Sequence, residues 1–149
     1  MKIIKRLLIF LLCIVMAGGI LFLISIPKVN DHIAKQTMTE LAQVPMPEQT
    51  ECIEKVSAAG KLSGNGNGMQ YLGALLVKSD LSLKDLKKYY AANTPGKWYC
   101  DVERQNGQSL RVSEHVDLRF KHPIKGKRYY VVYAWGDYDG IYSELDLRG

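Results

Sequence analysis

Residues 7–26 read LLIFLLCIVMAGGILFLISI, an apolar run without a charged side chain. As a helix that rises about 1.5 Å per residue, the run is roughly 30 Å long, the thickness of a bilayer's hydrocarbon core. The run therefore predicts a transmembrane helix, and the rest of the chain is expected to be organised around it.

Three other interpretations of this run are possible. A buried core helix would be shorter or would carry a polar stripe. A cleavable signal peptide has an apolar region of about 7–15 residues that ends at a small-x-small site, whereas residues 24–28 here read ISIPK. A lipoprotein is disfavoured because Cys13 lies inside the run and not after small residues. We therefore expect an uncleaved signal anchor.

The cations beside the run predict its orientation. Lys2, Lys5 and Arg6 precede it, and the few cations that follow are diluted by acidic residues. The positive-inside rule then places residues 1–6 in the cytoplasm and the C-terminal part of the chain outside the cell membrane. This exported part has 17 Lys and Arg against 15 Asp and Glu, a net charge of only +2. The overall basicity mostly reflects the anchor flank, and nucleic acid is not an expected partner.

Two of the three cysteines, Cys52 and Cys100, lie in the exported part. An even number of cysteines in an oxidising compartment favours a disulfide bond between them. The alternative is a pair of buried free thiols. A metal site is not expected, because the chain has no CxxC motif and no cluster of histidines.

Residues 27–47 are predicted to be a juxtamembrane stalk or linker. Asn30 or Asp31 can cap a short helix over 28–44, and the Pro-x-Pro sequence at 45–47 ends it. The apolar side of this helix is expected to comprise Val29, Ile33, Met38, Leu41 and Val44.

Residues 48–149 are predicted to form one α+β domain of the order ββαββββ, with one helix on an antiparallel sheet. The repeated Asn-Gly sequence at 63–68 predicts a hairpin connection. Ser82, followed by Asp85, predicts the start of the helix within 79–93. The expected strands are 52–58, 70–78, 98–103, 114–121, 128–135 and 141–147.

Two patterns raise the question of enzymatic or metal chemistry. The sequence from Asp137 through Asp139 to Gly140 matches part of a calcium loop, but Trp135 stands where the first carboxylate ligand belongs. His115 and His122 differ by an odd number, so on one strand they would point to opposite faces. We expect no catalytic residue, no metal and no cofactor.

The strongest candidate for ligand binding is one face of the strand at 128–135. Tyr129, Tyr133 and Trp135 share this face, and Arg119 and Lys121 are expected beside it. Aromatic rings next to cations suit a partner protein, a glycan or an anionic envelope polymer. Alternatively, the stalk or the N-terminal hairpin covers this face.

The layout of residues 45–147 has a Pro-x-Pro entry, a helix ending in Tyr-Tyr and a Trp soon afterwards. This layout resembles small domains that follow the anchors of bacterial envelope proteins, and the resemblance implies no functional residues. We expect a non-enzymatic binding domain anchored in the membrane of a bacterial cell envelope. The alternatives are a structural subunit of a membrane complex and a small envelope hydrolase that uses Asp137, Asp139 and a histidine.

Overall fold

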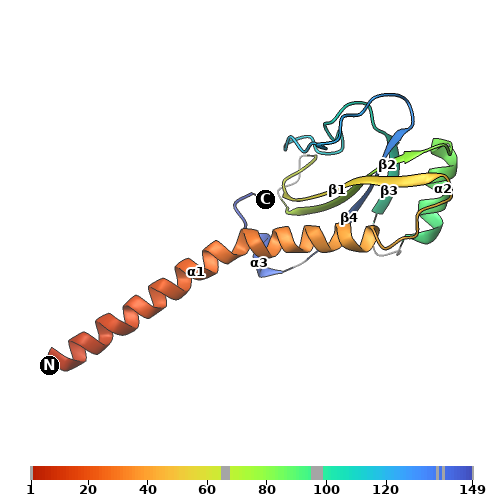
Figure 1. Ribbon diagram of the computed structural model, residues 1–149. Coiled ribbons are helices and arrows are strands. Elements are labelled where there is room, and N and C mark those ends of the chain that lie inside the picture. Colours follow the sequence, from red (N-terminus) through yellow and green to blue (C-terminus); the bar gives the residue numbers. More distant parts are fainter. Residues whose placement is uncertain (1, 65–67, 95–98, 137, 139, 149) are drawn as a thin grey trace.

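The computed structural model describes residues 2–64, 68–94, 99–136, 138 and 140–148. A long N-terminal helix, α1, runs out of a small domain that is built on a four-stranded antiparallel sheet (Figure 1). The predicted α+β class is confirmed. The predicted order ββαββββ is wrong, because the described part of the domain has four strands and the helix α1 is part of it.

Helix α1, Lys2–Leu41, is continuous through the predicted anchor and most of the predicted stalk. Its N-terminal half is apolar and projects away from the domain, so its large side chains from Ile3 to Ile24 are exposed. This half is long and apolar enough to cross a membrane. Pro27 lies inside the helix and does not end it.

The C-terminal half of α1 lies on the sheet. Its buried side chains recur every three or four residues, as expected for one face of a helix; they are Ile26, Asn30, Ala34, Thr37 and Leu41. Two glycines of the sheet, Gly73 and Gly136, lie directly under Thr37 and Met38 and allow this close approach. The residues expected to form a separate stalk are thus packed against the domain, and no helix begins at Asn30 or Asp31.

The sheet has the order β1-β2-β4-β3. Its strands are β1 (Thr50–Gly60), β2 (Gln70–Ser79), β3 (Tyr99–Arg104) and β4 (Tyr129–Gly136). The pairs β1–β2, β2–β4 and β4–β3 are all antiparallel. The predicted hairpin between β1 and β2 is confirmed, although residues 65–67 of its connection lie outside the described residues.

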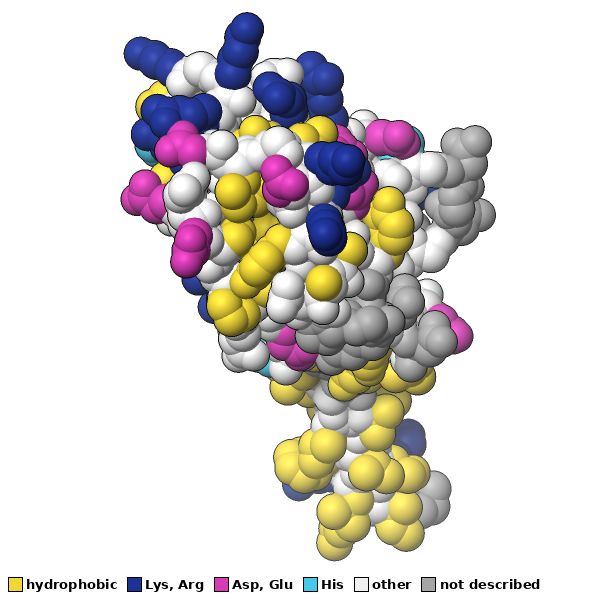
Figure 2. All heavy atoms as spheres, turned by 90° about the vertical axis from the view of Figure 1, so that its right-hand side faces the viewer, with side chains coloured by type: hydrophobic (Ala, Val, Ile, Leu, Met, Phe, Trp, Pro, Cys, Tyr) yellow, Lys and Arg dark blue, Asp and Glu magenta, His cyan; other side chains and the backbone are white. Residues whose placement is uncertain are grey.

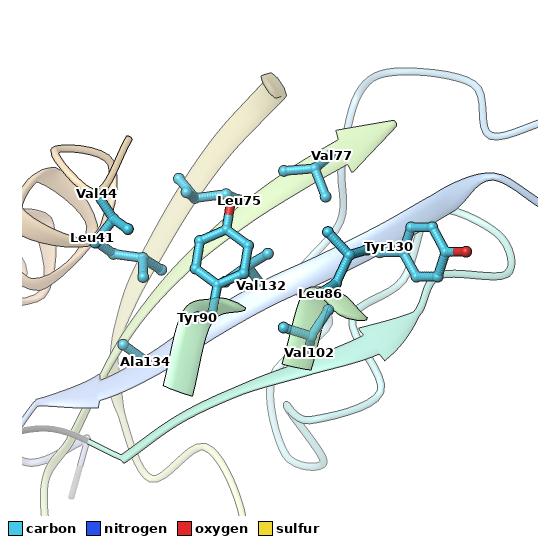
Figure 3. Packing of buried hydrophobic residues seen from close by; sticks show 10 residues of the cluster. All are labelled: Leu41, Val44, Leu75, Val77, Leu86, Tyr90, Val102, Tyr130, Val132 and Ala134. Carbon is cyan, nitrogen blue, oxygen red and sulfur yellow. The ribbon is translucent and has the colours of Figure 1, made fainter. Parts of the chain in front are cut away.

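Helix α2, Leu83–Asn93, matches the sequence prediction closely. The hydroxyl of Ser82 accepts a hydrogen bond from the backbone N–H of Asp85 at 3.2 Å, which satisfies one free donor of the first turn. Leu86 and Tyr90 then point from α2 toward Leu75 and Val132 of the sheet (Figure 3). Leu41 of α1 joins the same core, so α1 and α2 share one face of the sheet.

The other face of the sheet is covered by residues 105–128, which we call the loop layer. Leu110 and Phe120 of the loop layer are buried against Leu72, Ala74 and Val131. The strand predicted at 114–121 is wrong: the only ladder contact described there is an isolated bridge between Ser109 and Arg119. β4 pairs with β2 on one side and β3 on the other, so it offers no open edge to a following strand.

The same reason explains the end of the chain. A strand was predicted at 141–147, but a short helix, α3 (Ile141–Glu144), forms there instead. The hydroxyl of Ser143 donates a hydrogen bond to the carbonyl oxygen of Gly140 at 2.6 Å, which closes the turn. α3 and the last residues lie beside α1 (Figure 1).

Candidate functional site

The three aromatic residues of the predicted ligand face lie beneath the loop layer. Tyr133 is only 5% exposed, and its hydroxyl donates a hydrogen bond to Glu103 at 2.9 Å. Burial and the neighbouring Glu103 carboxylate raise the pKa of Tyr133 well above its usual range. Tyr129 and Trp135 are partly buried in the same cluster. Tyr133 is thus a core residue and the other two rings are partly covered, so the three do not form an open aromatic surface.

The two cations of the predicted face lie on the outside of the loop layer. Arg119 and Lys121 are both exposed. Arg119 forms an ion pair with Asp117 at 2.8 Å, and both partners are well exposed. The structure therefore separates the predicted group, with cations on the outer surface and aromatic rings below.

The loop layer is fixed to the sheet by backbone hydrogen bonds. The carboxylate of Glu54 on β1 accepts bonds from the N–H groups of Lys121 and His122, at 2.9–3.0 Å. Just beyond the C-terminal end of β1, the carbonyl oxygen of Leu62 accepts from the N–H groups of Glu114 and His115. These bonds hold the loop layer at the middle of β1 and beyond its end, and they fix the position of the Lys121 backbone over β1.

The loop layer carries an excess of positive charge. Residues 105–128 contain six Lys and Arg against two Asp and Glu, a net charge of +4. The rest of the exported part, 28–104 and 129–149, contains eleven against thirteen, a net charge of −2. Figure 2 shows Lys and Arg side chains gathered at the top of the domain, on the side of the loop layer. Charge is thus segregated, although the exported part is nearly neutral as a whole.

Several of these cations have no local counter-ion. We define the basic surface as the exposed cations of the loop layer: Arg111, Arg119, Lys121, Lys125, Lys127 and Arg128. Arg128 pairs with Asp80, and Arg119 with Asp117. Within the described part of the chain, the other four cations of the basic surface form no ion pair. Exposed, unpaired cations on one surface attract a polyanion.

A shallow polar pocket of about 430 Å³ lies at the end of the sheet next to Arg128. Lys78 and Arg128 line it, but so do Glu51 and Asp80. The hydroxyls of Thr50 and Ser79 are already bonded to each other at 2.6 Å. Because its charges balance, this pocket adds no further attraction for an anion.

The structure does not bring the predicted cysteine pair together. Cys52 lies on β1 and Cys100 on β3, the two opposite edges of the sheet. With three strand spacings of about 4.8 Å between these edges, the α-carbons of the two cysteines are about 14 Å or more apart. A disulfide needs α-carbons within roughly 7 Å. Both thiols are free and partly buried, and burial raises the pKa of each.

The two histidines considered for catalysis lie far from each other in the loop layer. The ring of His115 bonds to the carbonyl oxygen of Gly64 at 2.8 Å, at one end of the loop layer. His122 lies at the other end, 3.3 Å from the hydroxyl of Tyr129. Asp137 and Asp139 lie outside the described residues. Among the residues that are described, no three His, Cys, Asp or Glu side chains are grouped as metal ligands.

A buried polar cluster that the sequence did not lead us to expect joins α1 to the C-terminal residues. Asn30 is fully buried; its amide donates to Asp146 at 2.7 Å and its carbonyl oxygen accepts from the hydroxyl of Tyr71 at 2.9 Å. Arg148 donates to the same Asp146 carboxylate and to Asp31 of α1, both at 2.8 Å. The only signal was a polar residue, Asn30, four positions from Ile26 and from Ala34 on one helix face.

The charges of this cluster stabilise each other. Hydrogen bonds from Arg148, and then from Asn30, outweigh the effect of burial and lower the pKa of Asp146 to about 2. Burial is the main reason that the pKa of Tyr71 rises to about 12. Asp146 is therefore ionised and Tyr71 is neutral at physiological pH. The cluster holds the end of the chain against α1, and its acidic group is enclosed.

Comparison with protein-family models, with curated proteins and with solved structures finds no match to this chain.

Proposed function

We propose that this chain is a single-pass membrane protein of a cell envelope whose exported domain binds an anionic polymer through the basic surface. In this proposal residues 1–6 are cytoplasmic, residues 7–26 cross the bilayer, and the sheet domain lies outside. The domain binds and does not catalyse a reaction.

The exposed apolar half of α1 supports the anchor. None of the side chains in its most apolar stretch is buried by the domain. An apolar surface of this length is costly in water and is matched by a bilayer core. Lys2, Lys5 and Arg6 before it favour a cytoplasmic N-terminus.

The segregation of charge is the observation that carries the binding proposal. A net charge of +4 in residues 105–128 faces outward on a domain that is otherwise acidic. Lys121, Lys125 and Lys127 are exposed and form no ion pair among the described residues. Fixed cations of this kind bind polymers of phosphate, sulfate or carboxylate by releasing the counter-ions of the polymer.

The position of the basic surface favours a partner other than the lipid bilayer. From Ile26 to Leu41, α1 rises by about 22 Å. Leu41 lies near Leu75 of β2 (Figure 3), and the carbonyl oxygen of Arg128 accepts from the N–H of Ser79, farther along the same strand. The cations near Arg128 thus lie more than two Debye lengths, of about 8 Å each, beyond the end of the apolar run. At that distance lipid headgroups do not attract them.

Binding is tested on the full chain in nanodiscs of neutral phosphatidylcholine, with polyphosphate of defined length as the probe and dextran as the uncharged control. We expect binding to polyphosphate and none to dextran. The variant K121Q/K125Q/K127Q should lose at least about tenfold in affinity, because three phosphate contacts are removed.

The matched control is K84Q/K87Q/K88Q, which removes the same charge from exposed positions on α2. It should bind polyphosphate nearly as well as the wild type. Equal losses in the two triple variants would show that only net charge matters and would contradict a binding site on the loop layer.

The orientation is tested separately in intact cells with Lys125→Cys and Lys5→Cys, each in a background without the native cysteines. A membrane-impermeant maleimide should label position 125 in intact cells and position 5 only after lysis. Labelling of position 5 alone in intact cells would reverse the proposed topology.

A further inference from the structure

The C-terminal residues 140–148 fold back against α1 next to the C-terminal end of its apolar run. The ring of Tyr142 in α3 lies 5.6 Å from the ring of Phe22, centroid to centroid. The side-chain amide of Asn30 holds the carbonyl oxygen of Tyr142 at 2.9 Å. Phe22 is one helical turn before Ile26, so Tyr142 reaches about 6 Å into the length of the apolar run.

This part of the domain also presents apolar side chains to its surroundings. Ile141 is 58% exposed, Leu145 43% and Leu147 fully exposed. Leu145 and Leu147 border a small, mainly apolar pocket of about 200 Å³ together with Ile26 and Pro27 of α1. We call Ile141, Leu145 and Leu147 the apolar foot of the domain.

Several backbone N–H groups of the segment that carries the apolar foot have partners within it, and Asp146 is enclosed, whereas the side chain of Glu144 is exposed. The N–H groups of Ser143, Glu144 and Leu145 bond to carbonyl oxygens of Gly140 and Ile141. Asp146 is buried against Asn30 and Arg148. A backbone whose donors already have partners can enter the lipid interface without a large desolvation cost.

We propose that the apolar foot is a second membrane contact, which inserts into the interfacial region of the outer leaflet beside α1. The occupant of this surface is lipid, because the foot is continuous with the apolar half of α1: Tyr142, next to Ile141, contacts Phe22, and Leu145 and Leu147 border Ile26. Interfacial side chains of this kind enter the boundary between headgroups and acyl chains by about 5–10 Å, which matches the depth set by Tyr142. The inference rests on the proposed anchor. Together, the two contacts fix the tilt of the domain on the bilayer.

The test uses the full chain in vesicles of phosphatidylcholine and phosphatidylglycerol, with an environment-sensitive fluorophore on single cysteines. Ile141→Cys and Leu147→Cys probe the foot, and Lys127→Cys probes the far end of the domain. These three variants carry Cys13→Ser, Cys52→Ser and Cys100→Ser. A fourth protein keeps only the native Cys13, within the apolar run, and reports on the anchor itself.

The labels at positions 141 and 147 should show blue-shifted emission and should be quenched by lipids that carry a nitroxide near the headgroup. The label at 127 should be quenched only by aqueous iodide. If positions 141 and 147 behave like 127 while Cys13 is quenched by lipid, the second contact is disproved and the anchor stands. If Cys13 also escapes quenching by lipid, the proposed anchor is disproved and the second contact with it.

Discussion

Gly73 of β2 lies so close beneath Met38 of α1 that a β-carbon at position 73 would come within 2.5 Å of the Met38 backbone. A glycine is therefore required for α1 to rest on the sheet. Gly73→Ala should lower the free energy of unfolding by about 2–3 kcal/mol, because the backbone of α1 must shift. Urea unfolding of the full chain in micelles, followed by near-UV circular dichroism, measures this loss.

Gly136 provides the matched control. A β-carbon at Gly136 would collide with the side-chain hydroxyl of Thr37, which can be removed, and not with the helix backbone. Thr37→Ala should therefore recover much of the stability lost in Gly136→Ala and none of that lost in Gly73→Ala. Equal recovery in both backgrounds would contradict the close approach at Met38.

The bond between Asn30 and Tyr71 should contribute measurably to the attachment of α1. Asn30→Ala removes the buried bonds of the Asn30 amide to the hydroxyl of Tyr71 and to Asp146, whose carboxylate keeps only Arg148, so we expect a loss of about 2–4 kcal/mol. Tyr71→Phe removes the bond to Asn30 but leaves Asn30 bonded to Asp146, and it should cost about 1–2 kcal/mol. In a double-mutant cycle the two losses should be clearly non-additive. Additive losses would show that the two side chains do not interact.

The Asp146–Arg148 pair should make stability depend on acid. The folded pKa of Asp146 is about 2, below its ordinary value of 3.8, so its carboxylate stabilises the fold above the unfolded pKa. This contribution, about 2 kcal/mol at pH 7, should disappear as the pH falls from about 5 to 1. The stability difference between wild type and Asp146→Asn should shrink over the same range, as measured by urea unfolding at each pH.

Glu144→Gln is the control for the loss of one negative charge. Glu144 is exposed and lies two residues before Asp146. It should change stability little, because its side chain has no part in the described hydrogen bonds of the cluster. A difference for Asp146→Asn that stays constant down to pH 2 would show that Asp146 is not held ionised by Arg148.

The free thiols of Cys52 and Cys100 can be counted directly. Without reductant, both should react fully with maleimide in the unfolded chain, and slowly in the folded chain because each is partly buried with a raised pKa. Mass spectrometry of the labelled protein gives the number. Two cysteines that stay unlabelled after unfolding would show that Cys52 and Cys100 form a disulfide bond. That result would require a different arrangement of β1 and β3.

Local signals predicted α2 and the β1–β2 hairpin well, since their determinants are close in the sequence. The Ser82 cap contacts Asp85, three residues away, and the strands flank a short glycine-rich connection. The strands expected at 114–121 and 141–147 failed for a non-local reason. Their alternation is real, but both edges of β4 are occupied by β2 and β3.

The candidate site was predicted in part. Arg119 and Lys121 are exposed, as a charged face of an alternating segment suggests. The burial of Tyr133 depends on the loop layer, whose path over the sheet is fixed by Glu54, more than sixty residues earlier. The separation of Cys52 from Cys100 likewise depends on strand order, which counting cysteines does not reveal.

The salt dependence of polyphosphate binding tests the proposed function most directly. For the wild type in neutral nanodiscs, the logarithm of the affinity should fall linearly with the logarithm of the salt concentration. In K121Q/K125Q/K127Q the slope should be shallower by about one unit for each lost contact, roughly three in all. The α2 variant K84Q/K87Q/K88Q should keep the wild-type slope. A loop-layer variant with the wild-type slope would contradict binding through the basic surface.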